Sequence, residues 1–395
     1  MAVDKKRMNI GVFFGSRNPE HEVSIITGQM ILSGLRKLGY AVVPVYISRD
    51  GRWFSDSRLG SLKRFTGQEL DRAVEGMKPS SVGFDVRNGK LFLGNGGMFE
   101  KKTEIDLAFP AFHGRFGEDG SVQGLFELAG VPYVGCGVAA SAISMDKILT
   151  KQFYGSVGIG TTPFTHFDAV EWVDDNATVR ERIDGLRWPV FVKPARLGSS
   201  IGIAKVRNIG ELNDACEVAL HYDDRVIVEE AVEDVADMTC AVLGNGEPIA
   251  SLVQEAVFHG DHFSYEAKYL EDGGAQLGSA ENSLVIPAEL DEATTERIRS
   301  MAIRIYKLLD CSGTARVDFL YDRKRGDVYA NEVNTMPGTL YHHLWKASGI
   351  GFDELLEKLL NLALERSKSQ KRLSSEFGSR ILDFANSVKL RIDKG

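Results

Sequence analysis

The sequence predicts a protein of two or three domains, in which an N-terminal α/β region is followed by α+β regions. Its 395 residues exceed the roughly 250 to 300 residues at which a single core usually stops growing. Strand-like and helix-like segments alternate at the start of the chain, whereas later apolar segments come in pairs separated by short turns. Hydrophobic residues at 43% and charged residues at 26% are ordinary for a soluble globular protein.

The first region, residues 1–137, is expected to be an α/β domain. Three apolar segments are typical of buried strands: MNIGVFF, AVVPVYI and IDLAFPAF. A periodic apolar run predicts a helix over residues 22–38, and the Ser, Asn, Pro and acidic residues before it are typical of a helix start. The alternation of strand and helix favours a mostly parallel sheet.

Two α+β regions are expected to follow, over residues 138–235 and 236–370. The first has a helical pattern and then the stretch WPVFVKPARLGSSIGIAKV, an apolar strand, a Gly/Ser turn and another strand. The second has a helix near 291–309, a hairpin and a helix near 352–366. Residues 371–395 are polar and then weakly amphipathic, which predicts an accessory tail.

Composition excludes several classes of function. A formal net charge of -8 argues against a nucleic-acid-binding surface, which is normally basic. The four cysteines lie far apart without CxxC spacing, so neither a zinc site nor a disulfide framework is expected. No apolar stretch approaches the length of a membrane span, and the first one is too short for a signal-peptide core. We therefore expect a soluble cytoplasmic protein.

The expected hairpin consists of TARVDFLY, the turn DRKRG and DVYANEV. Strand alternation places Arg316 and Asp318 on one face, and it places Glu332 and Asn334 in phase on the partner strand. Two carboxylates and an amide oxygen form an all-oxygen set that suits Mg²⁺ better than zinc. The alternative is a solvent-facing strand with surface salt bridges, which contribute little energy.

The stretch KPARLGSSIGI is a second candidate for a binding site. Its glycine and serines offer exposed N–H and hydroxyl donors of the kind that hold phosphate, and Lys193 adds a positive charge. A routine turn between strands is the alternative. No Walker A loop occurs, and the Gly-x-Gly-x-x-Ala in VPYVGCGVAA lacks the acidic residue that a nicotinamide site needs about 20 positions later.

The glycine-rich loop in AFHGRFGEDGSVQG follows an expected strand and contains His113, Arg115, Glu118 and Asp119. Loops at the carboxyl ends of parallel strands are where α/β proteins bind ligands. The alternative is that Asp119 or a neighbouring serine only caps the next helix.

Two further stretches have both a functional and a structural interpretation. Glu22, in the first turn of the expected helix, either complements the helix dipole or binds a substrate ammonium. The stretch FSYEAKYLEDGG is either a lid that excludes water or an ordinary crossover loop.

Seven motifs in order resemble those of the D-alanine–D-alanine ligases of the ATP-grasp superfamily, from about Met8 to Arg366. The motifs are EHEVSIITG, HGRFGEDGSVQG, SAISMDK, KPARLGSSIGI, YEAKYL, ARVDF and NEVNTMPGT. The resemblance implies a three-domain ATP-grasp fold and a homodimer. It also implies ATP and D-alanine as substrates and two Mg²⁺ ions, with Mn²⁺ as the alternative metal.

The resemblance also implies roles for individual residues. Those implied to bind ATP are Lys147, Lys193, Glu229, Glu230, Val232, Asp237 and Lys268. Those implied to hold the metal are Asp318, Glu332 and Asn334. Those implied to act on the substrates are Glu22, Ser199, Tyr269, Arg316 and Gly338. Glu22 would bind the first ammonium and form a hydrogen-bonded set with Ser199 and Tyr269, while Arg316 and the Gly338 backbone would stabilise an oxyanion.

The implied reaction is the ATP-dependent joining of two D-alanine molecules through an acyl phosphate, for peptidoglycan synthesis. The chain departs from the family pattern at His343, where a serine commonly helps to hold the second substrate's carboxylate. A histidine could do so as a neutral donor or as a cation, or it could merely cap a helix or pack at the surface. D-Alanyl-D-lactate, D-alanyl-D-serine and a non-catalytic nucleotide-binding protein are therefore the alternatives.

Overall fold

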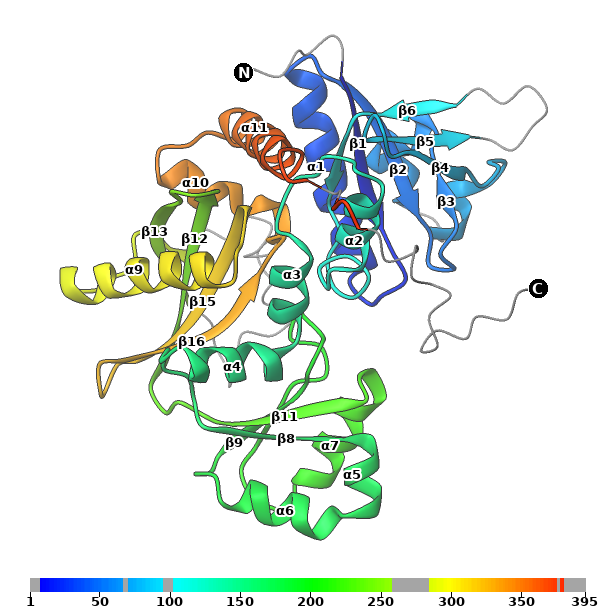
Figure 1. Ribbon diagram of the computed structural model, residues 1–395. Helices are drawn as coiled ribbons and strands as arrows, with labels where there is room; N and C mark the ends of the chain where they lie inside the picture. Colours follow the sequence, from blue (N-terminus) through cyan, green and yellow to red (C-terminus); the bar gives the residue numbers. More distant parts are fainter. Residues whose placement is uncertain (1–7, 67–69, 95–101, 258–283, 375–376, 380–395) are drawn as a thin grey trace.

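The computed structural model describes residues 8–66, 70–94, 102–257, 284–374 and 377–379. Within these ranges the strands form four sheets, which Figure 1 shows from the N-terminal part in blue to the C-terminal part in orange. The helices pack on the sheets and between them.

The N-terminal sheet has the order β3-β2-β1-β7. Its strands are β1 (Asn9–Gly15), β2 (Ala41–Ile47), β3 (Trp53–Phe54) and β7 (Leu107–Pro110). Strand β1 pairs in parallel with β2 and β7, and only β3 is antiparallel. Helix α1 (His21–Lys37) connects β1 to β2 and packs on the sheet. The predicted parallel α/β arrangement is confirmed.

A small antiparallel sheet of β4 (Ser81–Asp85), β5 (Lys90–Gly94) and β6 (Thr103–Ile105) lies beside the first. We did not predict it from the sequence. The first of these strands has no buried residue, so the apolar alternation that indicates a half-buried strand is missing there. Three short 3-10 helices, η1 (Ser57–Gly60), η2 (Leu62–Arg64) and η3 (Leu70–Val74), precede this sheet.

A second major sheet is antiparallel, with the order β10-β9-β11-β8. Its strands are β8 (Phe164–Asp168), β9 (Val190–Pro194), β10 (Ala204–Val206) and β11 (Arg225–Glu230). The helices that share its core are α5 (Ala169–Asp174), α6 (Asn176–Asp184) and α7 (Leu212–Tyr222). The predicted strand, Gly/Ser turn and strand are therefore β9, the turn and β10.

The third sheet, also antiparallel, has the order β14-β13-β12-β15-β16. Its strands are β12 (Val235–Gly244), β13 (Ile249–Ala256), β14 (Leu284–Val285), β15 (Gly313–Asp322) and β16 (Asp327–Asn334). Helices α3 (Val138–Met145), α4 (Lys147–Ser156) and α9 (Glu292–Leu308) share its core. The predicted hairpin is confirmed as β15 and β16.

The C-terminal helices return to the N-terminal sheet. After β16 come the 3-10 helix η6 (Gly338–Tyr341), α10 (His342–Ala347) and α11 (Phe352–Gln370), which packs against α1. The approach is close at Gly34, where an added Cβ would lie 2.5 Å from a methyl group of Leu356. Because of this packing, the segment after β16 lies next to the N-terminal region. Among the described residues, no helix has the length and apolar character needed to cross a membrane.

Candidate functional site

The β15–β16 hairpin brings a cationic side chain and three metal-binding candidates together. Arg316 lies opposite Asn334 in the register, and Asp318 lies opposite Glu332. The Arg316 guanidinium donates to both carboxylate oxygens of Asp318, from Nε at 2.8 and 3.0 Å and from Nη2 at 2.6 Å. Asn334 Nδ2 donates to Asp318 at 3.1 Å, and Thr239 Oγ1 donates at 3.0 Å from β12. The interpretation of these residues as a solvent-facing surface pair is wrong, because the Arg316 side chain is 4% exposed.

The residues at this hairpin fit a hard divalent cation. Burial raises the pKa of Asp318, and the charge of Glu332 raises it further, although Arg316 opposes both effects. Glu332 lies 3.9 Å from Lys147 Nζ and 3.9 Å from Arg316 Nη2. Two crowded carboxylates beside an amide group are a donor set that suits Mg²⁺ or Mn²⁺.

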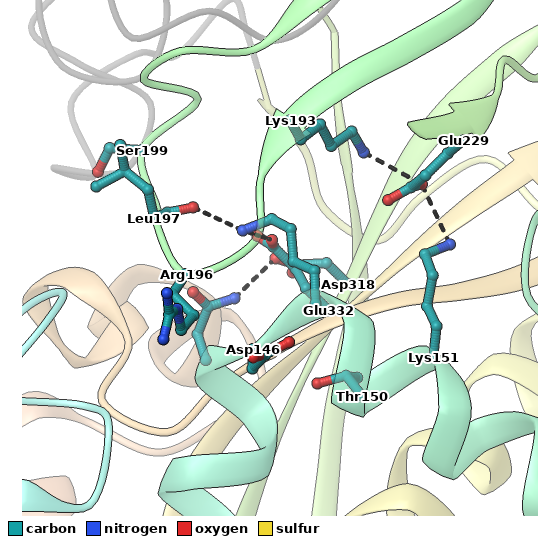
Figure 2. Close-up of polar contacts among 12 residues, drawn as sticks. Asp146, Thr150, Lys151, Lys193, Arg196, Leu197, Ser199, Glu229, Asp318 and Glu332 are labelled. Atoms are coloured by element: carbon teal, nitrogen blue, oxygen red, sulfur yellow. Dashed lines mark hydrogen bonds and ion pairs between the residues drawn. The ribbon is translucent and has the colours of Figure 1, made fainter. Parts of the chain in front are cut away.

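A buried cluster of two lysines and one glutamate lies on the neighbouring sheet. Figure 2 shows Lys151 from α4 and Lys193 from β9 pointing at the carboxylate of Glu229 on β11, at 3.1 and 3.3 Å. Lys151 also donates to the hydroxyl groups of Thr161 and Thr162 at 2.7 and 2.8 Å. The other oxygen of Glu229, Oε1, is buried and has no hydrogen-bond partner among the described residues.

Burial disfavours the charged form of both Glu229 and Lys151. It lowers the pKa of Lys151, whereas two ammonium groups outweigh burial at Glu229 and lower the pKa of its carboxyl to about 2. Glu229 is therefore an anion at neutral pH, and it lines the adjoining cavity with Oε1 as an unpaired acceptor.

Most of the residues implied to bind ATP line that cavity. It has a volume of about 130 Å³ and lies between the second and third sheets. Its lining includes residues implied to bind ATP and residues implied to hold the metal, namely Lys147, Lys193, Glu229, Glu230, Val232, Asp237, Asp318 and Glu332. The side chain of Glu230 also pairs with Arg187 at 3.4 Å. Lys268 and Tyr269 lie outside the described residues.

Lys147 begins α4 and reaches the Gly/Ser turn after β9. Asp146 caps this helix by accepting from the backbone N–H groups of Ile148 and Leu149, both at 3.0 Å. Lys147 Nζ then donates to the carbonyl oxygen of Leu197 at 2.6 Å, an interaction drawn in Figure 2.

The expected partnership of Glu22 with Ser199 is wrong, since Glu20 occupies that position. Ser199 has a left-handed backbone, with φ of 56°, and its hydroxyl donates to the buried carboxylate of Glu20. The Glu22 side chain is 64% exposed and pairs with Arg49 at 3.0 Å. Glu20 immediately precedes α1 and Glu22 lies in its first turn, so the two side chains take different directions and contact different partners.

Glu20 and Glu118 line a second, smaller cavity. The sequence predicts Glu118 only as part of a glycine-rich loop that could bind a ligand. Glu118 accepts from the backbone N–H of Gly114 at 2.9 Å and of Met336 at 3.1 Å. This cavity of about 40 Å³ is lined by Glu20, Glu118, Lys147, Glu332 and Asn334 among others. It therefore joins the N-terminal region to the end of β16.

The small cavity is short of positive charge. Burial raises the pKa of Glu20, and the charge of Glu118 raises it further. Glu20 Oε2 is buried without a hydrogen-bond partner in the described part of the chain. A Cβ on Gly114 would lie 2.5 Å from that oxygen, so only glycine leaves space for it. A small ammonium group would satisfy this oxygen and offset the charge of Glu118.

The segment after β16 has an unusual backbone. Thr339, Leu340 and Tyr341 all have positive φ, between 49° and 55°, which costs L-residues energy and is frequent at functional sites. Gly338 is buried at the start of this segment. The Tyr341 ring lies against the Arg316 guanidinium, 4.8 Å from its Cζ, and lines the larger cavity. The sequence does not predict Tyr341 as a site residue, because no motif around it indicates its contact with Arg316.

The structure does not support a carboxylate-binding role for His343. Burial lowers its pKa to about 4, with His342 and Arg316 adding to the effect, so the ring is neutral at physiological pH. Its Nε2 lies 2.7 Å from the amide oxygen of Gln254 and donates its proton there. The other nitrogen, Nδ1, is then a bare acceptor that would repel a carboxylate.

Comparison with known proteins agrees with this geometry. Residues 9–136 match the family description "D-ala D-ala ligase N-terminus", and residues 153–361 match "D-ala D-ala ligase C-terminus". A D-alanine--D-alanine ligase from Acetivibrio thermocellus is 40% identical over 92% of this chain and 97% of the relative. A ligase of the same name from Chlorobium phaeovibrioides is 39% identical over 93% and 99%.

This chain belongs to the D-Ala–D-Ala ligase family. Among solved structures of that family, the D-alanine-D-alanine ligase from Coxiella burnetii is 31% identical, with a TM-score of 0.75 over 92% of this chain and 96% of that chain. The VanG D-Ala:D-Ser ligase from Enterococcus faecalis is 33% identical, also with a TM-score of 0.75, over 90% and 99%. The predicted ATP-grasp fold class is thereby confirmed.

The charge of Glu229 should make stability depend on pH in the acid range. Its folded pKa of about 2 lies below the ordinary value of 4.5, so its contribution is complete above pH 4.5 and is lost as pH falls toward 2. The shift corresponds to about 3 kcal/mol. Glu229→Gln should therefore be less stable than the parent at pH 6, and urea unfolding should show this gap closing toward pH 3.

The exposed Glu22→Gln variant provides the control, because it should follow the parent at every pH. A gap between the parent and Glu229→Gln that is the same at pH 6 and pH 3 would contradict the ion-pair interpretation.

Proposed function

We propose that this protein is an ATP-dependent ligase that joins two D-alanine molecules into D-alanyl-D-alanine through an acyl phosphate. The observation that carries the proposal is the meeting of two cavities at Glu332 and Lys147. One cavity has the cations and oxygen ligands that suit a nucleotide phosphate chain. The other has the unpaired buried Oε2 of Glu20, with Glu118 in the same lining, which suits an ammonium.

The larger cavity is proposed to hold ATP. Lys147 and Lys193 provide positive charge for the phosphates, and the free Oε1 of Glu229 can accept from the exocyclic amino group of adenine. Asp318, Glu332 and Asn334 would hold two Mg²⁺ ions, or Mn²⁺ in their place. The bound metal would neutralise charge on the phosphate oxygens during transfer.

The smaller cavity is proposed to hold the first D-alanine, with its ammonium between Glu20 and Glu118. This position directs the carboxylate of D-alanine toward Glu332 and Lys147, where the two cavities meet. An oxygen of that carboxylate attacks the γ-phosphorus of ATP, and the bond to ADP breaks. The product is an acyl phosphate, which hydrolyses readily and therefore needs a site from which water is excluded.

The amine of the second D-alanine then attacks the acyl carbon, a proton leaves the nitrogen, and inorganic phosphate departs as the peptide bond forms. Arg316 and the backbone N–H of Gly338 are proposed to stabilise the oxyanion of this step. The Tyr341 ring covers one face of Arg316, and Asp318 fixes its edge, so the guanidinium is held in a single orientation.

D-Serine as the second substrate is the alternative favoured by a specific observation. A carboxylate-binding serine is replaced by the neutral His343, and a D-Ala:D-Ser ligase resembles this fold as well as a D-Ala-D-Ala ligase does. A non-catalytic nucleotide-binding role is disfavoured, because such a protein would have no need for the acidic pair of Glu20 and Glu118.

The purified protein should release ADP from MgATP in a manner that depends on D-alanine. A coupled ADP-release assay with D-alanine, D-serine and D-lactate as second substrates should give the highest kcat/KM with D-alanine. An absence of ADP release with every member of this panel would contradict the proposal, and a preference for D-serine would establish the alternative.

Glu20→Gln should lower kcat/KM for the first D-alanine by roughly 10- to 100-fold, because the ammonium loses one charged partner. Glu22→Gln is the matched control and should stay within about twofold of the parent, since that side chain is exposed and faces Arg49. A larger loss of kcat/KM in Glu22→Gln than in Glu20→Gln would contradict this assignment and indicate Glu22 as the substrate ligand.

The second-site KM should show no titration of His343. Since the pKa of His343 is about 4, the ring stays neutral at pH 5.5 and above. The ratio of the second-site KM of His343→Gln to that of the parent should therefore be constant between about pH 5.5 and 8. A ratio that rises or falls around pH 6.5 would show a charged histidine in the subsite.

A further inference from the structure

A third cavity lies apart from the proposed catalytic site. Its volume is about 300 Å³, and none of its lining residues lines either of the two cavities described above. One wall comes from the end of α2 (Ser121–Leu128) and the segment that follows it, and the other comes from the last turns of α11. The apolar part of the lining comprises Phe126, Val131, Pro132, Tyr133 and Ala363.

Arg366 places a guanidinium with spare donor capacity in this cavity. Its Nη1 donates to the carbonyl oxygen of Gly135 and to Ser312 Oγ, both at 2.6 Å. Its plane stacks on the Tyr133 ring, with Cζ 4.0 Å from the ring centroid. Its Nη2 is buried and has no hydrogen-bond partner among the described residues. An unpaired buried donor of a charged group is costly, so an acceptor is expected there.

The charges around the cavity favour an anion. Lys371 adds a second cation to the lining, at the end of α11. Among the described residues of the lining, Glu127 is the one acid, and its Oε1 already accepts from the Tyr133 hydroxyl at 2.7 Å. Within the described ranges, no carboxylate lies within 4.0 Å of either Arg366 or Lys371. Two cations therefore face one engaged carboxylate.

We propose that this cavity is a binding site for a small organic carboxylate with an apolar body. The carboxylate accepts from Arg366 Nη2 and pairs with Lys371, while the apolar body packs against Phe126, Val131 and Ala363. A free phosphate suits the site less well, because only two cations are present and much of the lining is apolar. This inference does not depend on the proposed reaction.

The site also lies at the junction between the N-terminal region and the third sheet. Gly135 lies beside the end of the segment, residues 9–136, that matches the N-terminal family description, and Ser312 immediately precedes β15, which bears Arg316 and Asp318. Ser312 Oγ itself donates to the Gly135 carbonyl at 3.0 Å, so Arg366 reinforces a connection that already exists. A carboxylate bound to Arg366 would therefore contact the residues that join these two parts.

Benzoate is a suitable probe, with benzamide as the uncharged control of the same shape. Titration calorimetry with MgADP and D-alanine present, so that the proposed catalytic cavities are filled, should detect benzoate binding at millimolar concentrations and no benzamide binding. Lys371→Gln should weaken benzoate binding roughly tenfold, because one charge-assisted contact is lost. Lys368→Gln, on the same helix but outside the lining, should leave it unchanged.

Arg366→Gln should abolish binding, but it also removes the contacts to Gly135 and Ser312, so its folding is checked by thermal unfolding. Because Lys371 is exposed, Lys371→Gln should fold normally, so the test does not depend on whether Arg366→Gln folds. An absence of benzoate binding to the parent would overturn the proposal. So would equal binding by the parent and Lys371→Gln, or binding of benzamide as strong as that of benzoate.

Discussion

The pairing register of β15 and β16 is the constraint on which the rest of the site depends. A slip of one residue would turn every side chain of the slipped strand to the other face, and Arg316, Asp318 and Glu332 would no longer converge. The register shifts only after Asp318, where a bulge leaves an extra residue on β16. The polar pairs that form the site lie before that bulge, so their alternation is intact. The metal-binding candidates and the oxyanion candidate thus share one short piece of regular structure.

Buried charge is distributed unevenly across the site, and the imbalance matches the proposed substrates. Lys151 and Lys193 both contact the carboxylate of Glu229, so the cations outnumber the anion within this buried cluster. The small cavity is lined by Glu20, Glu118 and Glu332 with Lys147 as the one cation among its described residues, so negative charge is in excess. Each excess costs energy in the protein alone, because buried charges need partners. A substrate of opposite charge would relieve that cost on binding.

Local patterns were sufficient to predict the elements of the site but not every side chain in it. Apolar alternation predicted the hairpin, and the Gly/Ser turn between two strands was recognised from its residues. Glu22 was chosen over Glu20 because both lie near a helix start, and sequence order does not show which of them faces the Gly/Ser turn. The lid residues Lys268 and Tyr269, the homodimer and the domain boundaries stay predictions.

The sequence by itself determined the fold class, the hairpin with its metal-binding candidates, and the order of the motifs, because strand periodicity and turn chemistry are local properties. Only the tertiary structure decided which groups are buried and what they contact. The positions of the turn after β9 and of the loop at Gly114 bring Glu20 against Ser199. Desolvation then makes His343 neutral, and the contact between Tyr341 and Arg316 forms between segments 25 positions apart. Burial and long-range contact are properties of the packed chain, and no short stretch of sequence contains them.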